Sequence, residues 1–190
     1  MKLNTPNKLT LVRLLLVPVF VVIFAIFHTE TWGRIVAAVL FSVASFTDFL
    51  DGKIARKQGL ITDFGKFLDP LADKFLVISA LITLLFVDNS GIYGILLFAA
   101  TIIVVFRELA VTSMRLVVAT SPDKKVIAAS WLGKVKTGSQ ITFVIIAILE
   151  PLFWGERIFS CVFMAPMTVM TVWSGLSYII GYWKYLDPSK

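Results

Sequence analysis

Cysteine and histidine are almost absent from this 190-residue sequence, which contains only Cys161 and His28. One cysteine cannot form a disulfide or a thiolate metal site within the chain. One histidine in a short polar segment does not make a zinc centre, so we expect neither zinc chemistry nor histidine-based catalysis. The sequence also has no internal repeat and no low-complexity segment, and we expect a single domain over residues 1–190.

Charge is scarce as well, because only 16% of the residues are charged, against about 25% in an average soluble domain. Hydrophobic residues make up 58% of the chain and the mean hydropathy is +0.88, which indicates an integral membrane protein. The net charge is +6, but the basic residues lie between long apolar runs. We therefore expect membrane lipid and phosphate-bearing substrates as partners, and no nucleic acid.

Six apolar runs have about the length of 20 residues that a transmembrane helix needs. They cover residues 9–27, 33–50, 68–87, 92–118, 138–154 and 158–183. Polar or turn-forming segments at 28–30, 88–91 and 121–125 separate them, and a short break at 154–156 makes the last two runs a tight hairpin. The first run contains Arg13 and is followed by no small-residue cleavage pattern, so we interpret it as a retained helix. The expected fold is all-α, a polytopic membrane bundle of six transmembrane helices.

The basic residues predict how this bundle is oriented. Sixteen of the 18 lysines and arginines fall on or near one side of the six runs, and only Arg34 and Arg157 fall on the other. Positively charged segments stay in the cytoplasm, so we expect both termini, and the segments 51–67 and 119–137, to be cytoplasmic. The expected location is the inner (plasma) membrane, with multiple passes.

Four aspartates are the most informative residues of the chain. Asp48 and Asp51 end the second run, and Asp69 and Asp73 begin the third. Spacings of three and four put each pair on one helical face, and an antiparallel hairpin brings the pairs together at the membrane boundary. Because carboxylates are hard oxygen ligands without histidine or cysteine beside them, Mg²⁺ or Mn²⁺ is the expected partner. Two such ions would suit phosphate transfer.

The residues between the aspartate pairs favour the same chemistry. Gly52 lies one turn after Asp48 and Gly65 one turn before Asp69, so each lies on a carboxylate face, where glycine lets a ligand approach the backbone. Ala55 extends this surface of small residues. Arg56 can bind a phosphate group through two hydrogen bonds.

The stretch from 48 to 73 resembles the signature of the CDP-alcohol phosphotransferase family, D-x2-D-G-x2-A-R-x8-G-x3-D-x3-D, at all eight fixed positions. The resemblance implies that the four aspartates hold two divalent metals and that Asp73 is the general base. It implies that a CDP-linked alcohol binds on the face of Gly52, Ala55 and Arg56, with Gly65 beside it. It also implies a homodimer.

The choice of acceptor depends on residues outside this signature. Arg107 and Arg115 are eight apart and share a helical face, and Lys134, Lys136 and Thr137 open the fifth run. We expect these residues to form a basic pocket beside the metals, with Glu108 pairing with one of the cations. So much positive charge suits an acceptor that already carries phosphate.

Two further segments resemble the branch of the family that accepts glycerol phosphate. One is Arg107-Glu108 followed by Gly133-Lys134-Val135-Lys136-Thr137-x2-Gln140, and the other is Pro6-Asn7-x-Leu9-Thr10-x2-Arg13. In the second segment, Asn7, Thr10 and Arg13 share one polar face that can line the nucleotide site.

The resemblance thus implies transfer of the phosphatidyl group from CDP-diacylglycerol to sn-glycerol 3-phosphate, with phosphatidylglycerol phosphate and CMP as products. An alternative is another phosphorylated acceptor, such as inositol phosphate. Two different classes of function are a divalent-cation transporter and a non-catalytic lipid-binding scaffold. Carboxylates near the middle of the bilayer would favour transport, whereas CMP release would exclude the scaffold.

Overall fold

The computed structural model describes residues 5–58, 63–120 and 131–183, and this part of the chain is helical with no strand. The α-helices are α1 (Thr5–Phe27), α2 (Thr31–Gln58), α3 (Asp63–Val87), α4 (Gly91–Thr120), α5 (Trp131–Leu149) and α6 (Ile158–Tyr182), with a 3₁₀ turn, η1 (Glu150–Leu152), after α5. The expected all-α fold is confirmed. In hydrocarbon a helix is favoured because it satisfies its backbone hydrogen bonds internally.

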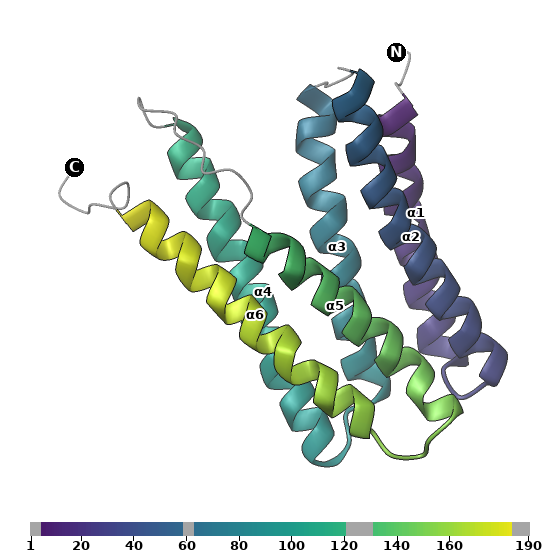
Figure 1. The fold of residues 1–190 in the computed structure, drawn as a ribbon. Helices are drawn as coiled ribbons and strands as arrows, with labels where there is room; N and C mark the ends of the chain where they lie inside the picture. Colours follow the sequence, from purple (N-terminus) through teal and green to yellow (C-terminus); the bar gives the residue numbers. More distant parts are fainter. Residues whose placement is uncertain (1–4, 59–62, 121–130, 184–190) are drawn as a thin grey trace.

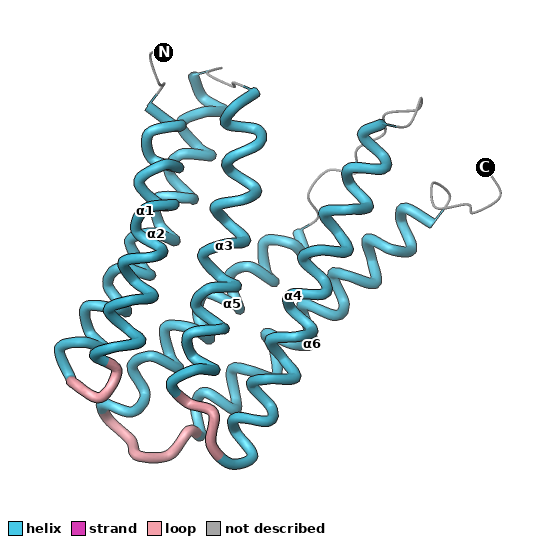
Figure 2. The backbone as a smooth tube through the Cα atoms, turned by 180° about the vertical axis from the view of Figure 1, so that it is seen from behind, coloured by secondary structure: helices cyan, strands magenta, loops and turns pink. Residues whose placement is uncertain are grey.

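The helices run up and down between two ends of the bundle (Figure 1). The loops that join α1 to α2, α3 to α4, and α5 to α6 lie together at one end, which we call the loop end (Figure 2). The close of α2 and the opening of α3 lie at the opposite end, the motif end. Helices α1, α2 and α3 pack together, α4 packs on α6, and α5 contacts α2, α3 and α6. Helix α5, together with the contact between α3 and α4, therefore joins the two groups.

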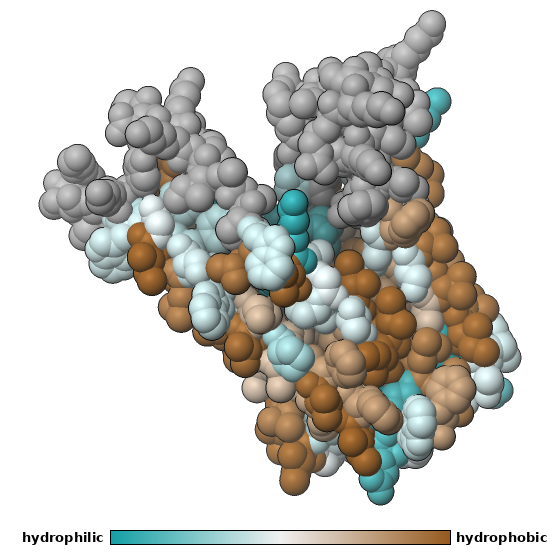
Figure 3. Space-filling model, viewed as in Figure 1, coloured by the Kyte–Doolittle hydropathy of each residue, from teal (hydrophilic) through white to brown (hydrophobic). Residues whose placement is uncertain are grey.

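Five of these helices are long and apolar enough to cross a membrane: α1, α3, α4, α5 and α6. In α2 the apolar part, Thr31–Thr47, is shorter, because the charged motif occupies the rest of that helix. Large apolar side chains cover the outside, as Figure 3 shows for one face. Leu15, Phe86 and Ile92 are each more than two-thirds exposed, which suits contact with lipid chains and would be unfavourable in water.

Aromatic and aliphatic side chains fill the centre of the bundle. Phe20 lies between Phe24 and Phe41, with ring centroids 5.9 and 5.7 Å apart, so that α1 packs on α2. Phe143 of α5 is fully buried in the same cluster. A second cluster joins α4 to α6 and consists of Val111, Met114, Val118, Tyr178 and Tyr182.

The turn between α1 and α2 depends on glycine. A Cβ atom on Gly33 would lie 2.1 Å from the carbonyl oxygen of Phe27, closer than any side chain allows. The first turn of α2 can therefore approach the end of α1 only because residue 33 has no side chain.

Ion pairs around Asp88 join three parts of the chain at the loop end. Its Oδ1 lies 3.8 Å from Nη2 of Arg34 and also pairs with Nη2 of Arg157. The same arginines donate hydrogen bonds to the carbonyl oxygens of Ile148 (3.1 Å, from Arg34) and Ala147 (2.7 Å, from Arg157). These contacts connect helices from both groups.

A second buried carboxylate at the loop end caps α6. Glu150 accepts hydrogen bonds from the backbone N–H groups of Phe159 (2.6 Å) and Ser160 (2.8 Å), and from the Ser160 hydroxyl. These N–H groups lie in the first turn of α6, where they have no partner inside the helix. Glu150 therefore supports the α5–α6 hairpin, which is present as expected.

Helix boundaries differ from the expected runs most clearly in α5, which begins at Trp131 and ends at Leu149 instead of covering 138–154. The helix includes residues before 138 because Lys136 is buried with a partner, Glu108, inside the bundle. It ends early because Pro151 has no N–H group to continue the hydrogen-bond pattern, and η1 replaces the last turn.

Candidate active site

The signature residues lie on two neighbouring helices at the motif end. Asp48, Asp51, Gly52, Ala55 and Arg56 belong to the second half of α2, and Gly65, Asp69 and Asp73 belong to the first half of α3. Helices α2 and α3 contact each other. Of this set, only Gly65, which is buried, and Asp73 have described surroundings. The side chains of the other members lie outside the part that the structure describes.

A small polar cavity adjoins Asp73, and three helices form its walls. It is lined by Asp73, Lys74, Val77, Glu108, Lys136, Thr137 and Gln140. The cavity measures about 10 Å³, the space of a single water molecule, so by itself it is too small to hold a substrate. It nevertheless brings the last aspartate of the signature next to the predicted acceptor-binding residues Lys136 and Thr137.

Glu108 of α4 is the centre of the charged contacts in this cavity. Its Oε1 accepts a hydrogen bond of 2.5 Å from Nζ of Lys136 and one of 3.0 Å from Nη1 of Arg107. All three side chains are buried, with at most 9% of each residue exposed. The sequence predicted that Glu108 pairs with one cation, whereas the structure shows that it pairs with two.

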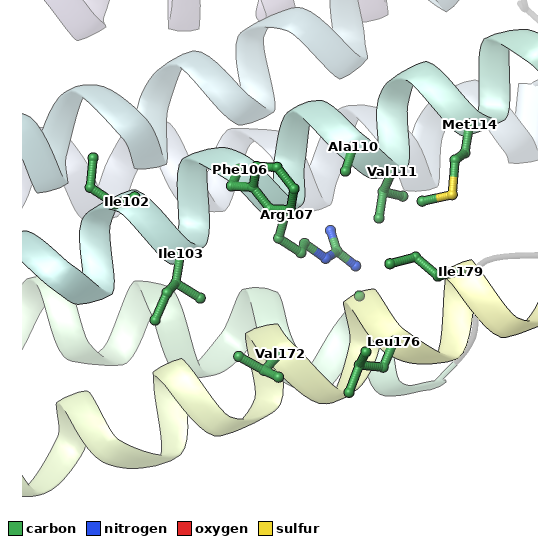
Figure 4. A pocket seen from close by; sticks show the side chains of 11 residues that line it. Ile102, Ile103, Phe106, Arg107, Ala110, Val111, Met114, Val172, Leu176 and Ile179 are labelled. Carbon is green, nitrogen blue, oxygen red and sulfur yellow. The ribbon is translucent and has the colours of Figure 1, made fainter.

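Arg107 also lines an apolar groove of about 390 Å³ between α4 and α6, and Figure 4 shows its guanidinium pointing toward α6. The guanidinium lies 5.7 Å from the centroid of the Tyr178 ring. Arg115 contacts the same tyrosine, donating a 2.6 Å hydrogen bond to its hydroxyl. The two arginines share a face of α4, as expected, and this face is directed to α6.

The predicted acceptor pocket is thus brought together only in part. Arg107, Lys136 and Thr137 lie at or beside the cavity, while the Lys134 side chain is exposed on α5. Arg115 is exposed and held by Tyr178. Gln140 lines the cavity and donates a 3.3 Å hydrogen bond to Thr171 of α6. In the sequence it stood out only as the last residue of a segment that resembles one branch of the family.

Asn7, Thr10 and Arg13, the predicted polar face of the first helix, point into the protein and not toward lipid. Their exposed fractions are 6%, 1% and 0%. A buried arginine in a membrane helix needs a polar surrounding, and the three residues provide a polar strip where α1 packs on α2 and α3.

The donor set of the signature fits divalent metal. Four aspartates offer only oxygen ligands, which Mg²⁺ and Mn²⁺ prefer, and they lie on two helices that contact each other. Among the described side chains there is no cluster of three metal-binding residues, since Asp73 is the one signature aspartate whose side chain is described.

Comparison with known proteins agrees with the signature. The family model for CDP-alcohol phosphatidyltransferases matches residues 3–177. A Bacillus subtilis (strain 168) protein named CDP-diacylglycerol–glycerol-3-phosphate 3-phosphatidyltransferase is 40% identical, with 98% of this chain and 99% of the relative aligned. Proteins of the same name from Shigella flexneri serotype 5b and Escherichia coli K12 are each 37% identical over 94% of both chains.

Proposed function

The chain belongs to the CDP-alcohol phosphatidyltransferase family, and on that premise we propose that it transfers the phosphatidyl group of CDP-diacylglycerol to sn-glycerol 3-phosphate. The products are phosphatidylglycerol phosphate and CMP, so the enzyme acts in phospholipid biosynthesis. The observation that carries this proposal is that Asp73 of the signature shares one cavity with Lys136 and Thr137, residues of the segment that suits a phosphorylated acceptor. The names of the near full-length relatives support the same acceptor.

In the proposed reaction the C1 hydroxyl oxygen of glycerol 3-phosphate attacks the phosphorus that carries diacylglycerol. Asp73 accepts the hydroxyl proton as general base. The new oxygen–phosphorus bond forms while the bond to the CMP oxygen breaks, and CMP leaves with that electron pair. Arg56 stabilises the negative charge that develops on the departing phosphate. The nucleotide binds on the face of Gly52, Ala55 and Gly65, and Asn7 and Thr10 lie at the edge of this nucleotide site.

Two divalent ions, Mg²⁺ or Mn²⁺, belong to this proposal. Asp48, Asp51, Asp69 and Asp73 would hold them, and when bound they polarise the pyrophosphate and neutralise its charge. The acceptor phosphate is bound by the cations of α4 and α5: Arg107 and Lys136, with Thr137 beside them and Arg115 and Lys134 further out. Because each charge-assisted hydrogen bond is strong at a buried site, this set selects a phosphorylated acceptor over an uncharged alcohol.

The proposal includes a topology and an assembly. All six helices cross the inner membrane, both termini are cytoplasmic, and the motif end faces the cytoplasm. This orientation follows from the positive-inside bias of sixteen basic residues against two. It also lets the acyl chains of the substrate remain in lipid while soluble glycerol 3-phosphate arrives from water. A homodimer is proposed from family resemblance.

The test is release of CMP from CDP-diacylglycerol by purified protein, with glycerol 3-phosphate, inositol phosphate, serine or no acceptor. We expect release, and formation of phosphatidylglycerol phosphate, with glycerol 3-phosphate alone. Excess EDTA should abolish turnover and added Mg²⁺ or Mn²⁺ should restore it. Full activity in EDTA would contradict the metal assignment. Preference for inositol phosphate would mean that inositol phosphate, and not glycerol 3-phosphate, is the acceptor.

A further inference from the structure

Glu108 has no part in the reaction described above, yet it makes the closest contacts with the residues proposed to bind the acceptor. Its Oε1 lies 2.5 Å from Nζ of Lys136 and 3.0 Å from Nη1 of Arg107. The three residues come from α4 and α5. Glu108 and Lys136 line the cavity together with Asp73 and Lys74 of α3, and Arg107 lies beside it. The arrangement therefore places one carboxylate between two cations at this cavity.

Burial makes these contacts important for the position of Lys136. Only 5% of Lys136 and 6% of Glu108 are exposed, and a buried ammonium group without a partner is strongly unfavourable. Lysine is a point charge on a flexible stem of four carbons, so its position is set by its partner. The other carboxylate that lines the cavity is Asp73.

We propose that Glu108 is a positioning residue for the phosphorylated acceptor. Its carboxylate holds the Lys136 ammonium and the Arg107 guanidinium where both meet the acceptor phosphate, and it keeps Lys136 from pairing with Asp73. The charges of the three side chains sum to +1. A net attraction for phosphate therefore remains after the Glu108 charge has been neutralised. This inference rests on the proposed function, because it concerns the acceptor of that reaction.

The test is a double-mutant cycle with the purified full-length protein, CDP-diacylglycerol and glycerol 3-phosphate. Glu108→Gln keeps the shape of the side chain and removes its charge. We expect the KM for glycerol 3-phosphate to rise about tenfold or more, the effect of a lost charge-assisted hydrogen bond, with little change in the KM for CDP-diacylglycerol. Because Glu108 acts through Lys136, Glu108→Gln should add little to the effect of Lys136→Gln in the double variant.

Glu150→Gln is the matched control, since Glu150 is an equally buried carboxylate at the loop end. It should lower thermal stability and leave the acceptor KM unchanged. Glu108→Asp keeps the charge on a shorter side chain, so it should recover part of the acceptor KM, and it serves as the test if Glu108→Gln does not fold.

Two results would overturn the inference. One is an equal change in both KM values, and the other is additive effects of Glu108→Gln and Lys136→Gln. Either result is expected if Glu108 only stabilises the fold. Failure of the proposed function is a separate result. It appears in the wild-type protein as absence of phosphatidylglycerol phosphate, whereas failure of this inference appears only as the pattern among variants.

Discussion

Asp73 is the residue at which the signature meets the described cavity, and it gives the sharpest single-residue prediction. Asp73→Asn keeps the size of the side chain and removes its ability to accept a proton. We expect turnover to fall by roughly 10²–10⁴-fold, measured as CMP release, with a smaller effect on binding of CDP-diacylglycerol. Glu156→Gln, an exposed carboxylate at the loop end, should have no effect. Near-normal turnover of Asp73→Asn would show that another group is the base.

Lys134 and Lys136 are two residues apart but differ in environment, so they should differ in effect. Lys136 is buried against Glu108, whereas Lys134 is exposed. Lys136→Ala should therefore raise the KM for glycerol 3-phosphate by about 10- to 150-fold, the range for a lost hydrogen bond to a charged group. Lys134→Ala should raise it much less. Steady-state kinetics at fixed CDP-diacylglycerol measure both, and equal effects would mean that the acceptor binds nearer the surface than the cavity.

Residue types and spacing predicted the role of the aspartates but not the partners of the cations. Spacings of three and four along a helix identify a shared face, so the pairs Asp48/Asp51 and Asp69/Asp73 could be recognised locally. The contact between Glu108 and Lys136 joins residues 28 positions apart, and no local pattern encodes it. Arg107 and Arg115 were correctly placed on one face of α4, but the sequence did not show that Tyr178 of α6 meets that face.

Among the helices, the α1–α2 turn offers a test that is independent of the active site. Gly33→Ala would place a Cβ 2.1 Å from the Phe27 carbonyl oxygen, so α2 must move away from α1 or the turn must open. We expect a loss of stability at the upper end of the range for point substitutions, about 3 kcal/mol, seen as a lower Tm in detergent. Gly155→Ala is the control, because nothing lies within 4 Å of its added Cβ. If Gly33→Ala had the Tm of the wild-type protein, the close approach of α2 to the end of α1 would be contradicted.

Helices were easier to predict than their ends. Long apolar runs identified α1, α3, α4 and α6 to within a few residues, because membrane-spanning length is set by the bilayer. The start of α5 was predicted too late, since hydropathy counts Lys134 and Lys136 as polar and does not show that Glu108 pairs with Lys136 inside the bundle. In α2 the helix extends to Gln58, past the apolar part, because the lysines and arginine in this stretch are good helix formers although hydropathy counts them as polar.

For the whole molecule, the loop end and the motif end differ in how they are held. Asp88, Arg34 and Arg157 join three parts of the chain at the loop end. From the sequence, Asp88 was predicted only as a turn residue and the two arginines only as evidence for the orientation. Their meeting depends on how all six helices are arranged, which spacing along the chain does not reveal. At the motif end the axes of α1–α3 diverge from those of α4 and α6 (Figure 2). The ion pairs at the loop end therefore help to hold the two groups of helices together.

The orientation of the bundle can be tested with single cysteines, because the chain has only Cys161 to remove. In a Cys161→Ser background, Glu156→Cys places a thiol in the exposed α5–α6 loop, and Lys125→Cys places one in the segment between α4 and α5. The positive-inside bias predicts that the first is external and the second cytoplasmic. A membrane-impermeant maleimide should therefore label Glu156→Cys in intact spheroplasts and Lys125→Cys only after permeabilisation. The reverse pattern would place the motif end outside, where cytoplasmic glycerol 3-phosphate does not reach it, and equal labelling of both would mean that α5 does not cross the membrane.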